Sequence, residues 1–300
     1  MTYFFIKGGF SVNIKNNILF FLITASLTSS VLCTPKTITV FSHGIADTWE
    51  QVHGYTKSYK KNDTIYRNDR YLLHTPFVTF NYPDATDKFY RVNYNETSFG
   101  QDNEIGRLNK AYTSTMSRYE NCDIILWGLS RGASNILIFA GLYQLNNVKA
   151  LLVESPYFTM GEIIESIIMK KNLSWIPLSY AETIAESIFK KYTRHGSSPA
   201  NCIENISKEI PIFIICSKED RLVPFSSSIN VYKKLVESGH KHTYIFITEY
   251  GKHAAILQGP DGEKYQWVVN AFYKKYNLPH CAASAAQGKS LLTLCQPKFD

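Results

Sequence analysis

One serine in the chain stands in a setting typical of an enzyme nucleophile. The pattern around it is G-x-S-x-G and reads Gly128-Leu129-Ser130-Arg131-Gly132. An apolar run typical of a strand, Asp123–Trp127, comes directly before it, and an apolar helical pattern, Ala133–Leu142, comes directly after it. In such a strand–turn–helix, side chains in place of the two glycines would clash, and the turn holds the hydroxyl near the positive end of a helix. Ser130 is therefore the candidate nucleophile for attack on a carbonyl carbon.

A serine nucleophile needs a base, and His253 is the candidate. This histidine follows the last apolar run, Tyr244–Thr248, and precedes a helical pattern. Loops at the carboxyl ends of parallel strands are where the sites of α/β proteins collect. His43 lies on a different loop and is interpreted as a structural residue of that loop. The other six of the eight histidines lie in polar or irregular segments, which is typical of solvated surface residues.

The base in turn needs a carboxylate to orient it, and Asp220 is the candidate. It follows the apolar run Ile212–Cys216. Glu219, its neighbour, and Glu154, which follows the strand after the Ser130 turn, are the alternatives. The order of nucleophile, acid and base along the chain favours Asp220.

Two backbone N–H groups are candidates for holding the negative charge that develops on the carbonyl oxygen. One belongs to Arg131, directly after the nucleophile, and the other to Ile45, in the loop after the first apolar run. Gly44 lets the backbone of this loop approach a substrate closely. Backbone donors of this kind stabilise an oxyanion without reorganising during the reaction.

Six short apolar runs alternate with longer helical patterns and indicate how these residues are positioned. The runs are Thr37–Phe41, Phe77–Asn81, Asp123–Trp127, Ala150–Val153, Ile212–Cys216 and Tyr244–Thr248. Continuous apolar runs are typical of strands covered on both faces of a parallel sheet. The helical patterns include Asp102–Tyr119, with Asp102 as a candidate N-cap, Ser226–Ser238 and Glu263–Tyr276. The alternation predicts an α/β fold with a mostly parallel central sheet flanked by helices.

A longer interval, residues 157–209, interrupts this alternation and predicts a small helical cap. It contains two helical patterns, Met160–Lys171 and Tyr180–Lys191. The alternative is an ordinary crossover helix followed by a long loop. The apolar face of the first pattern indicates either an apolar substrate or packing on the core, and both interpretations stay open.

The first 33 residues are predicted to be a signal peptide rather than part of the folded domain. Residues 1–33 contain two lysines and no acidic residue, and Ile18–Leu27 has the length of a signal-peptide apolar region. The alternative is an uncleaved membrane anchor. The prediction is therefore an exported protein, secreted or periplasmic, or one anchored through this segment.

The folded domain is predicted to cover residues 34–280, followed by a loop-like tail over 281–300. Export makes disulfides possible, and the best pair to suspect is Cys281 with Cys295, both in the tail. No cysteine spacing resembles a zinc site. No metal and no cofactor are expected.

Composition excludes several classes of protein. Hydrophobic residues make up 45% and charged residues 19%, which excludes a disordered chain and a coiled coil. The net charge of +7 is spread along the chain without a dense Lys/Arg block, so no nucleic-acid partner is expected. No later stretch is long and apolar enough to span a membrane.

Taken together, four segments make the chain resemble the α/β-hydrolase superfamily. They are His43-Gly44, the turn around Ser130, Asp220-x-x-Val223-Pro224 and Gly251-x-His253. The resemblance spans residues 37–276 and is most similar to the branch of lipases, esterases, thioesterases and serine peptidases with a small cap. It implies a core of parallel strands, a Ser-Asp-His triad and no cofactor. The chain departs from the family pattern at two places. Asn81-Tyr82-Pro83-Asp84 replaces a Gly-rich turn, and the HGGG-type loop of some lipases is absent. Both departures bear on the class of substrate and not on the fold.

The leading functional hypothesis is a serine hydrolase that cleaves an ester, thioester or amide through an acyl-enzyme, most similar to a carboxylesterase or lipase. Its partner would be a small-molecule or lipid-like acyl substrate. One alternative is a serine peptidase of the prolyl-oligopeptidase-like branch, although no large N-terminal propeller precedes the domain. The other is a non-catalytic binding protein on a hydrolase scaffold.

Overall fold

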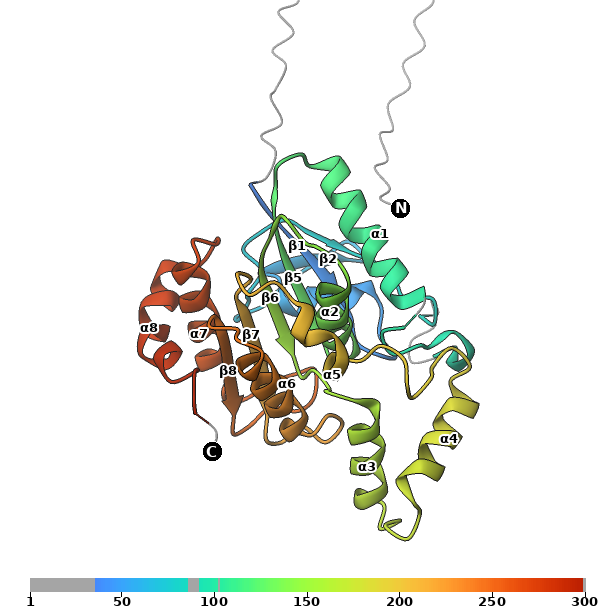
Figure 1. The fold of residues 1–300 in the computed structure, drawn as a ribbon. Helices are drawn as coiled ribbons and strands as arrows, with labels where there is room; N and C mark the ends of the chain where they lie inside the picture. Colours follow the sequence, from blue (N-terminus) through green and yellow to red (C-terminus); the bar gives the residue numbers. More distant parts are fainter. Residues whose placement is uncertain (1–35, 86–91, 102, 299–300) are drawn as a thin grey trace, which may run out of the picture. The chain divides into compact units, whose positions relative to one another are not determined.

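The computed structural model describes residues 36–85, 92–101 and 103–298, so the predicted signal and the predicted N-cap Asp102 lie outside it. Six parallel strands form one sheet in the order β4-β1-β5-β6-β7-β8 (Figure 1). The strands are β1 (Thr37–Ser42), β4 (Phe77–Thr79), β5 (Asp123–Leu129), β6 (Val148–Glu154), β7 (Ile212–Ser217) and β8 (Thr243–Thr248). Every predicted strand is present, and the predicted parallel α/β architecture is confirmed.

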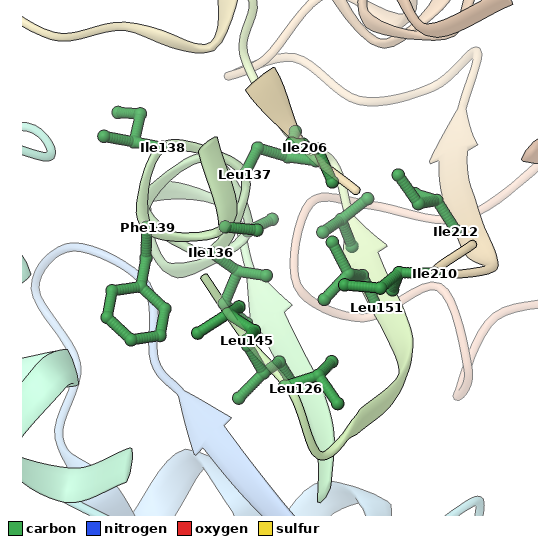
Figure 2. Packing of buried hydrophobic residues seen from close by; sticks show 14 of the residues in the cluster. Leu126, Ile136, Leu137, Ile138, Phe139, Leu145, Leu151, Ile206, Ile210 and Ile212 are labelled. Atoms are coloured by element: carbon green, nitrogen blue, oxygen red, sulfur yellow. The ribbon is translucent and has the colours of Figure 1, made fainter. Parts of the chain in front are cut away.

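Helices cover both faces of the sheet. In each strand, alternate side chains point to opposite faces of the sheet, so each strand contributes to two separate buried clusters. In β5, Ile124 and Leu126 join one buried cluster, whereas Ile125 and Trp127 join the other. The first cluster also takes side chains from α1 (Asn103–Arg118), α2 (Arg131–Leu142) and α6 (Phe225–Glu237), and Figure 2 shows α2 contributing Ile136 to it. The second takes side chains from α7 (Gly262–Lys275) and the 3₁₀ helix η1 (Trp49–Tyr55).

The interval between β6 and β7 holds four helical segments. They are α3 (Met160–Lys170), α4 (Leu178–Ile188), α5 (Pro199–Cys202) and the 3₁₀ helix η3 (Ile203–Asn205). The first two contact each other as a hairpin (Figure 1), whereas the last two pack against α2. On α3 only Ile168 is buried, while Ile167 and Met169 are 52% and 61% exposed. Part of the apolar face of α3 is therefore exposed to solvent and does not pack on the sheet core.

Two hairpin strands lie outside the predicted elements. They are β2 (Ser58–Lys61) and β3 (Thr64–Arg67), which pair antiparallel. Asn62 and Asp63 join them with φ angles of 48° and 61°. Two residues with positive φ make the turn whose twist matches that of the flanking strands, and asparagine and aspartate tolerate this conformation best after glycine. A short 3₁₀ helix, η2 (Tyr94–Glu96), completes the region before α1.

The segment predicted as a loop-like tail instead contains a helix, α8 (Ala282–Thr293), which packs on α7. A Cβ at Gly288 would lie 2.0 Å from the Trp267 carbonyl oxygen, so this glycine allows the two helices to approach closely. The suspected Cys281–Cys295 disulfide is wrong as well, since both thiols are free. The helix separates them by about 20 Å along its axis, far beyond the span of about 6 Å that a disulfide bridges.

Residues after α8 return to the sheet beside β8. The Ile245 N–H donates to the carbonyl of Cys295 at 2.7 Å. The Gln296 side-chain amide donates to the carbonyls of Lys241 and Thr243, each at 3.1 Å. Throughout the described residues, no helix combines the length and the apolar character that crossing a membrane requires.

Candidate active site

Ser130 occupies a strained turn between β5 and α2. Its φ of 56° and ψ of −120° are unusual for a residue with a side chain. A Cβ at Gly128 would lie 2.4 Å from the Gly132 carbonyl oxygen, and a Cβ at Gly132 would lie 2.1 Å from the Ser42 carbonyl oxygen. Both glycines therefore have the steric role that the sequence pattern suggests, and the strain at Ser130 is held in place by its surroundings.

Asp220 and His253 form a hydrogen-bonded pair at the ends of β7 and β8, with 2.7 Å between His253 Nδ1 and Asp220 Oδ2. Ser155 Oγ donates to the same carboxylate oxygen at 2.9 Å, and the N–H groups of Leu222 and Val223 each donate to Oδ1 at 2.9 Å. Burial raises the pKa of Asp220, but the hydrogen bond and charge of His253 and the two N–H groups outweigh it, so the pKa lies below its usual value. The carboxylate is thus ionised and fully paired.

The two alternative acids make other contacts. Glu219 Oε2 accepts from the N–H of Gly251 at 2.9 Å and so ties the histidine loop to the loop that carries Asp220. Glu154 is buried, and its Oε2 accepts from the hydroxyls of Tyr55 and Tyr265. Burial raises the pKa of Glu154 to about 7, although the two tyrosine hydrogen bonds oppose the shift. Neither carboxylate hydrogen-bonds the imidazole of the candidate base.

Backbone contacts bring the serine turn to the same edge of the sheet as this pair. The N–H of Ser130 donates to the carbonyl of Glu154 at 2.7 Å, and the next residue, Ser155, is the one that donates to Asp220. Within the described residues Ser130 Oγ has no hydrogen-bond partner. The hydroxyl is thus free for a substrate, and the serine–histidine hydrogen bond in such sites often tightens only once a substrate is bound.

The two predicted oxyanion donors lie next to the serine. A Cβ at Gly44 would lie 3.5 Å from Ser130 Cβ, which places the Gly44–Ile45 loop against the nucleophile. The Gly44 N–H is occupied by Gln51 Oε1 at 2.8 Å. By contrast, the N–H groups of Ile45 and Arg131 have no hydrogen-bond acceptor in the part of the chain that the structure describes. These two donors therefore remain available to a developing oxyanion.

His43 is a structural residue of this loop. It is fully buried, its Nδ1 lies 2.7 Å from the Gly44 carbonyl oxygen, and its Nε2 accepts from the N–H of Tyr82 at 3.2 Å. Burial, assisted by the positive charge of Arg131, lowers the pKa of His43 to about 3. The ring is therefore neutral, with Nδ1–H as the donor, and both nitrogens are engaged away from a substrate.

A buried charge network beneath the oxyanion loop is the feature that sequence reasoning missed. The Arg131 guanidinium is buried and pairs with the carboxylates of Asp84 and Glu104. It also donates to the Gly44 carbonyl at 3.2 Å and lies 4.4 Å from the centre of the Tyr82 ring. The one available signal was Asp84, in the segment that departs from the Gly-rich pattern.

An apolar cluster adjoins the site. Its buried members are Phe99, Tyr157, Tyr192 and Val223. Ile45 of the oxyanion loop packs against it, as do Ile163 of α3 and Phe189 at the end of α4. A cavity of about 190 Å³ lies beside it; Phe99, Tyr157 and Tyr192 line one part, and polar side chains that include Glu182 and Arg194 line the rest. Because Val223 lies three residues after the candidate acid and Ile45 is a predicted oxyanion donor, the cluster borders the candidate site on two sides.

Metal-ligating side chains do not gather here. Across residues 36–85, 92–101 and 103–298, no group of three or more His, Cys, Asp or Glu side chains is placed to hold a metal ion.

Comparison with known proteins finds likeness in structure rather than in sequence. No protein-family model matches the chain, and no curated protein matches it. An esterase of Pyrococcus furiosus is 16% identical, with a TM-score of 0.53 and coverage of 80% of this chain and 82% of that one. An acylaminoacyl peptidase of Pyrococcus horikoshii is 17% identical, with a TM-score of 0.52, covering 79% of this chain and 37% of that one. At such identity the likeness shows a shared fold.

Proposed function

Because the chain has the α/β-hydrolase fold, we propose that it is a serine hydrolase that cleaves carboxylic esters through an acyl-enzyme. The observation that carries the proposal is the His253–Asp220 hydrogen bond of 2.7 Å at the sheet edge where Ser130 occupies its strained turn. A nucleophile, a base and an orienting acid in this arrangement suit acyl transfer. The esterase named in the comparison is similar over most of its length, which favours esters.

In the proposed reaction Ser130 Oγ attacks the carbonyl carbon while His253 Nε2 takes the hydroxyl proton. Asp220 keeps the other ring nitrogen protonated and stabilises the imidazolium. The N–H groups of Ile45 and Arg131 hold the negative oxygen of the tetrahedral intermediate. Collapse of that intermediate releases the alcohol, which receives the proton from His253. A water molecule then attacks the acyl-enzyme with His253 again as base, so that the acid is released and the serine restored.

The apolar cluster beside the site supports an apolar acyl group as the preferred substrate. In this cluster, the Phe99 ring packs edge to face with two others. Its centroid lies 4.8 Å from that of Phe189 and 5.7 Å from that of Tyr192. Side chains with little hydrogen-bonding capacity select an alkyl or aryl chain over a polar one. The hydroxyl of Tyr157 is occupied by the Phe99 carbonyl at 3.1 Å, so it adds no free donor to this surface.

A fluorophosphonate probe tests the proposed nucleophile, and p-nitrophenyl esters of graded chain length test the reaction. We expect labelling and turnover by the wild-type chain, with both lost in Ser130→Ala and in His253→Ala. Labelling that persists in Ser130→Ala would contradict the nucleophile. A wild-type chain with neither labelling nor turnover would favour the binding-protein alternative, and cleavage of amides in preference to esters would favour the peptidase alternative.

We also propose that residues 1–33 direct export, in keeping with their two lysines, apolar centre and lack of acidic residues. Mass spectrometry of the protein recovered from a secreting host tests this. We expect an N-terminus near residue 34, and an intact N-terminus on membrane-bound protein would favour the anchor instead.

A further inference from the structure

The Arg131 side chain is unusual in its position, because a fully buried guanidinium lies directly behind the loop that carries an oxyanion donor. Its Nη2 donates to the Gly44 carbonyl at 3.2 Å, and the Nδ1–H of His43 donates to the same oxygen at 2.7 Å. The Gly44 carbonyl therefore receives two hydrogen bonds from the protein interior.

This carbonyl belongs to the same peptide unit as the Ile45 N–H. The chain has no cis peptide bond among the described residues, so the unit is trans and planar, and its C=O and N–H point in opposite directions. Two donors that hold the C=O toward the interior consequently hold the N–H away from it. The Ile45 N–H has no acceptor among the described residues, and the adjoining Gly44 lies against Ser130.

The guanidinium is itself fixed from several sides. Asp84 and Glu104 pair with Nη1, and the Tyr82 ring covers the planar group at 4.4 Å. Glu104 is anchored in turn, since its Oε1 accepts from the N–H of Ser98 at 2.9 Å and its Oε2 accepts from Asn135 Nδ2 at 2.8 Å. A buried ion pair is weak evidence of added stability, because desolvation offsets the attraction, and its best-attested use is to specify one arrangement.

We propose that Arg131 is a positioning residue, whose side chain aims the Ile45 N–H at the oxyanion while its own N–H supplies the second donor. The inference rests on the proposed function, and it assigns to the residue after the nucleophile a second task that the sequence pattern does not reveal. A backbone donor at residue 131 survives any substitution except proline, so the side-chain effect can be measured separately.

The test compares Arg131→Lys with a charge-compensated variant, Arg131→Met/Asp84→Asn/Glu104→Gln. Lysine keeps a cation for the two carboxylates but lacks the fork that reaches Gly44 as well, and the compensated variant leaves no buried carboxylate unpaired. Circular dichroism and thermal unfolding establish that each variant is folded. The readouts are kcat and KM on a p-nitrophenyl ester, and the inhibition constant of a trifluoromethyl ketone. The serine oxygen adds to the carbonyl carbon of this inhibitor, and the carbonyl oxygen becomes an oxyanion in the tetrahedral adduct.

We expect kcat to fall by about 10- to 100-fold in both variants, with KM within about twofold of the wild type, since loss of an oxyanion donor costs about 10²- to 10³-fold and misalignment costs less. The inhibition constant should rise by a factor similar to the fall in kcat/KM. Folded variants whose kcat and inhibition constant stay within about twofold of the wild type would overturn the inference.

Asn270→Ala is the matched control for loss of stability alone. Asn270 is fully buried on α7, its Oδ1 accepts from the N–H of Cys281 at 2.7 Å and its Nδ2 donates to the Gln266 carbonyl at 2.8 Å, so these hydrogen bonds do not involve the oxyanion loop. We expect a lower Tm with unchanged kcat and inhibition constant. Equal effects on kcat from Asn270→Ala and Arg131→Lys would show that stability explains both and would overturn the inference. A wild-type chain without labelling or turnover is a different result, because it overturns the proposed function itself.

Discussion

Ser155 Oγ donates a hydrogen bond of 2.9 Å to Asp220 Oδ2, the oxygen that also lies 2.7 Å from His253 Nδ1. Ser155 has a φ of 50°, which is costly for a residue with a side chain. It follows β6 directly, whereas Asp220 and His253, the proposed acid and base, follow β7 and β8. A strained residue that follows a third strand therefore helps to fix the pair on which the proposed reaction depends.

Ser155→Ala should lower kcat by about tenfold with little change in KM, because a hydrogen bond to a charged group contributes about 1.5–3 kcal/mol. Ser228→Ala is a matched control, since Ser228 is a buried serine whose Oγ donates to the Pro156 carbonyl at 3.1 Å. We expect the control to lose some stability and keep its kcat. Steady-state ester hydrolysis measures both, and an unchanged kcat in Ser155→Ala would contradict a supporting role.

Asp220→Asn should lower kcat by about 10⁴-fold, because an amide at this position favours the wrong tautomer of the histidine. Glu219→Gln and Glu154→Gln should each retain much more activity, since neither side chain hydrogen-bonds the imidazole. Hydrolysis of a p-nitrophenyl ester and the rate of fluorophosphonate labelling measure the three variants side by side. Loss of activity confined to Glu154→Gln would assign the acid to that residue instead.

Glu154 should make the free energy of unfolding depend on pH. Burial raises the pKa of Glu154 to about 7 in the folded chain from an ordinary value of 4.5. The folded state therefore binds the proton of Glu154 more tightly than the unfolded state does. Protonation of Glu154 thus stabilises the folded state, and this contribution is complete below about pH 4.5. It falls as the pH rises toward 7, by a total of about 3 kcal/mol.

Guanidinium unfolding of the wild type and of Glu154→Gln at pH 5 and pH 8 measures this effect. We expect the variant to gain stability relative to the wild type at the higher pH, because glutamine remains neutral. Glu165→Gln, on the exposed side of α3, controls for the loss of a surface charge. A difference between wild type and Glu154→Gln that is the same at both pH values would contradict the prediction.

Gly132→Ala should prevent stable folding or abolish activity, since its Cβ would lie 2.1 Å from the Ser42 carbonyl oxygen. Gly106→Ala is the contrasting substitution, because Gly106 lies within α1 and nothing approaches within 4 Å of the added Cβ. Alanine is favoured over glycine in a helix by up to about 1 kcal/mol, so Gly106→Ala should be slightly more stable than the wild type. Thermal unfolding with residual activity measures the pair, and a fully active Gly132→Ala would refute the steric argument.

Phe189→Ala should shift the preference for acyl chain length. Phe189 packs against Phe99 in the apolar cluster beside the site. We expect kcat/KM for octanoate or longer p-nitrophenyl esters to fall several-fold relative to acetate. Tyr143→Ala, which removes an exposed aromatic on the far end of α2, serves as the control. An unchanged ratio between long and short esters in Phe189→Ala would remove the cluster from the substrate site.

The sequence predicted the strands and the main helices well, because their apolar runs and stripes are long and continuous. It placed Asp220 and His253 after the last two predicted strands, from the apolar runs that precede them, and chain order favoured Asp220 over the other carboxylates; the structure shows that these two strands are neighbours. It missed the β2–β3 hairpin because these strands are exposed and carry no apolar pattern. It missed α8 because most of the apolar residues there are alanines and do not form an apolar stripe.

The Arg131 network was beyond sequence reasoning for a different reason. Its partners Asp84 and Glu104 lie 47 and 27 residues away along the chain, and no local spacing connects them. Arginine side chains are ordinarily exposed, and only the packing of Tyr82 and the loop around Gly44 shows that this one is buried.

The return of the chain beside β8 closes one margin of the sheet to other molecules. A bare outer strand presents unpaired N–H and C=O groups on which a strand from a second chain can be added. Here Cys295 and Gln296 occupy such groups at Ile245, Lys241 and Thr243. At the opposite margin, β4 is only three residues long and offers little backbone for pairing. The first half of β8 and the short β4 therefore offer little backbone to an intermolecular strand, which disfavours aggregation independently of the proposed reaction.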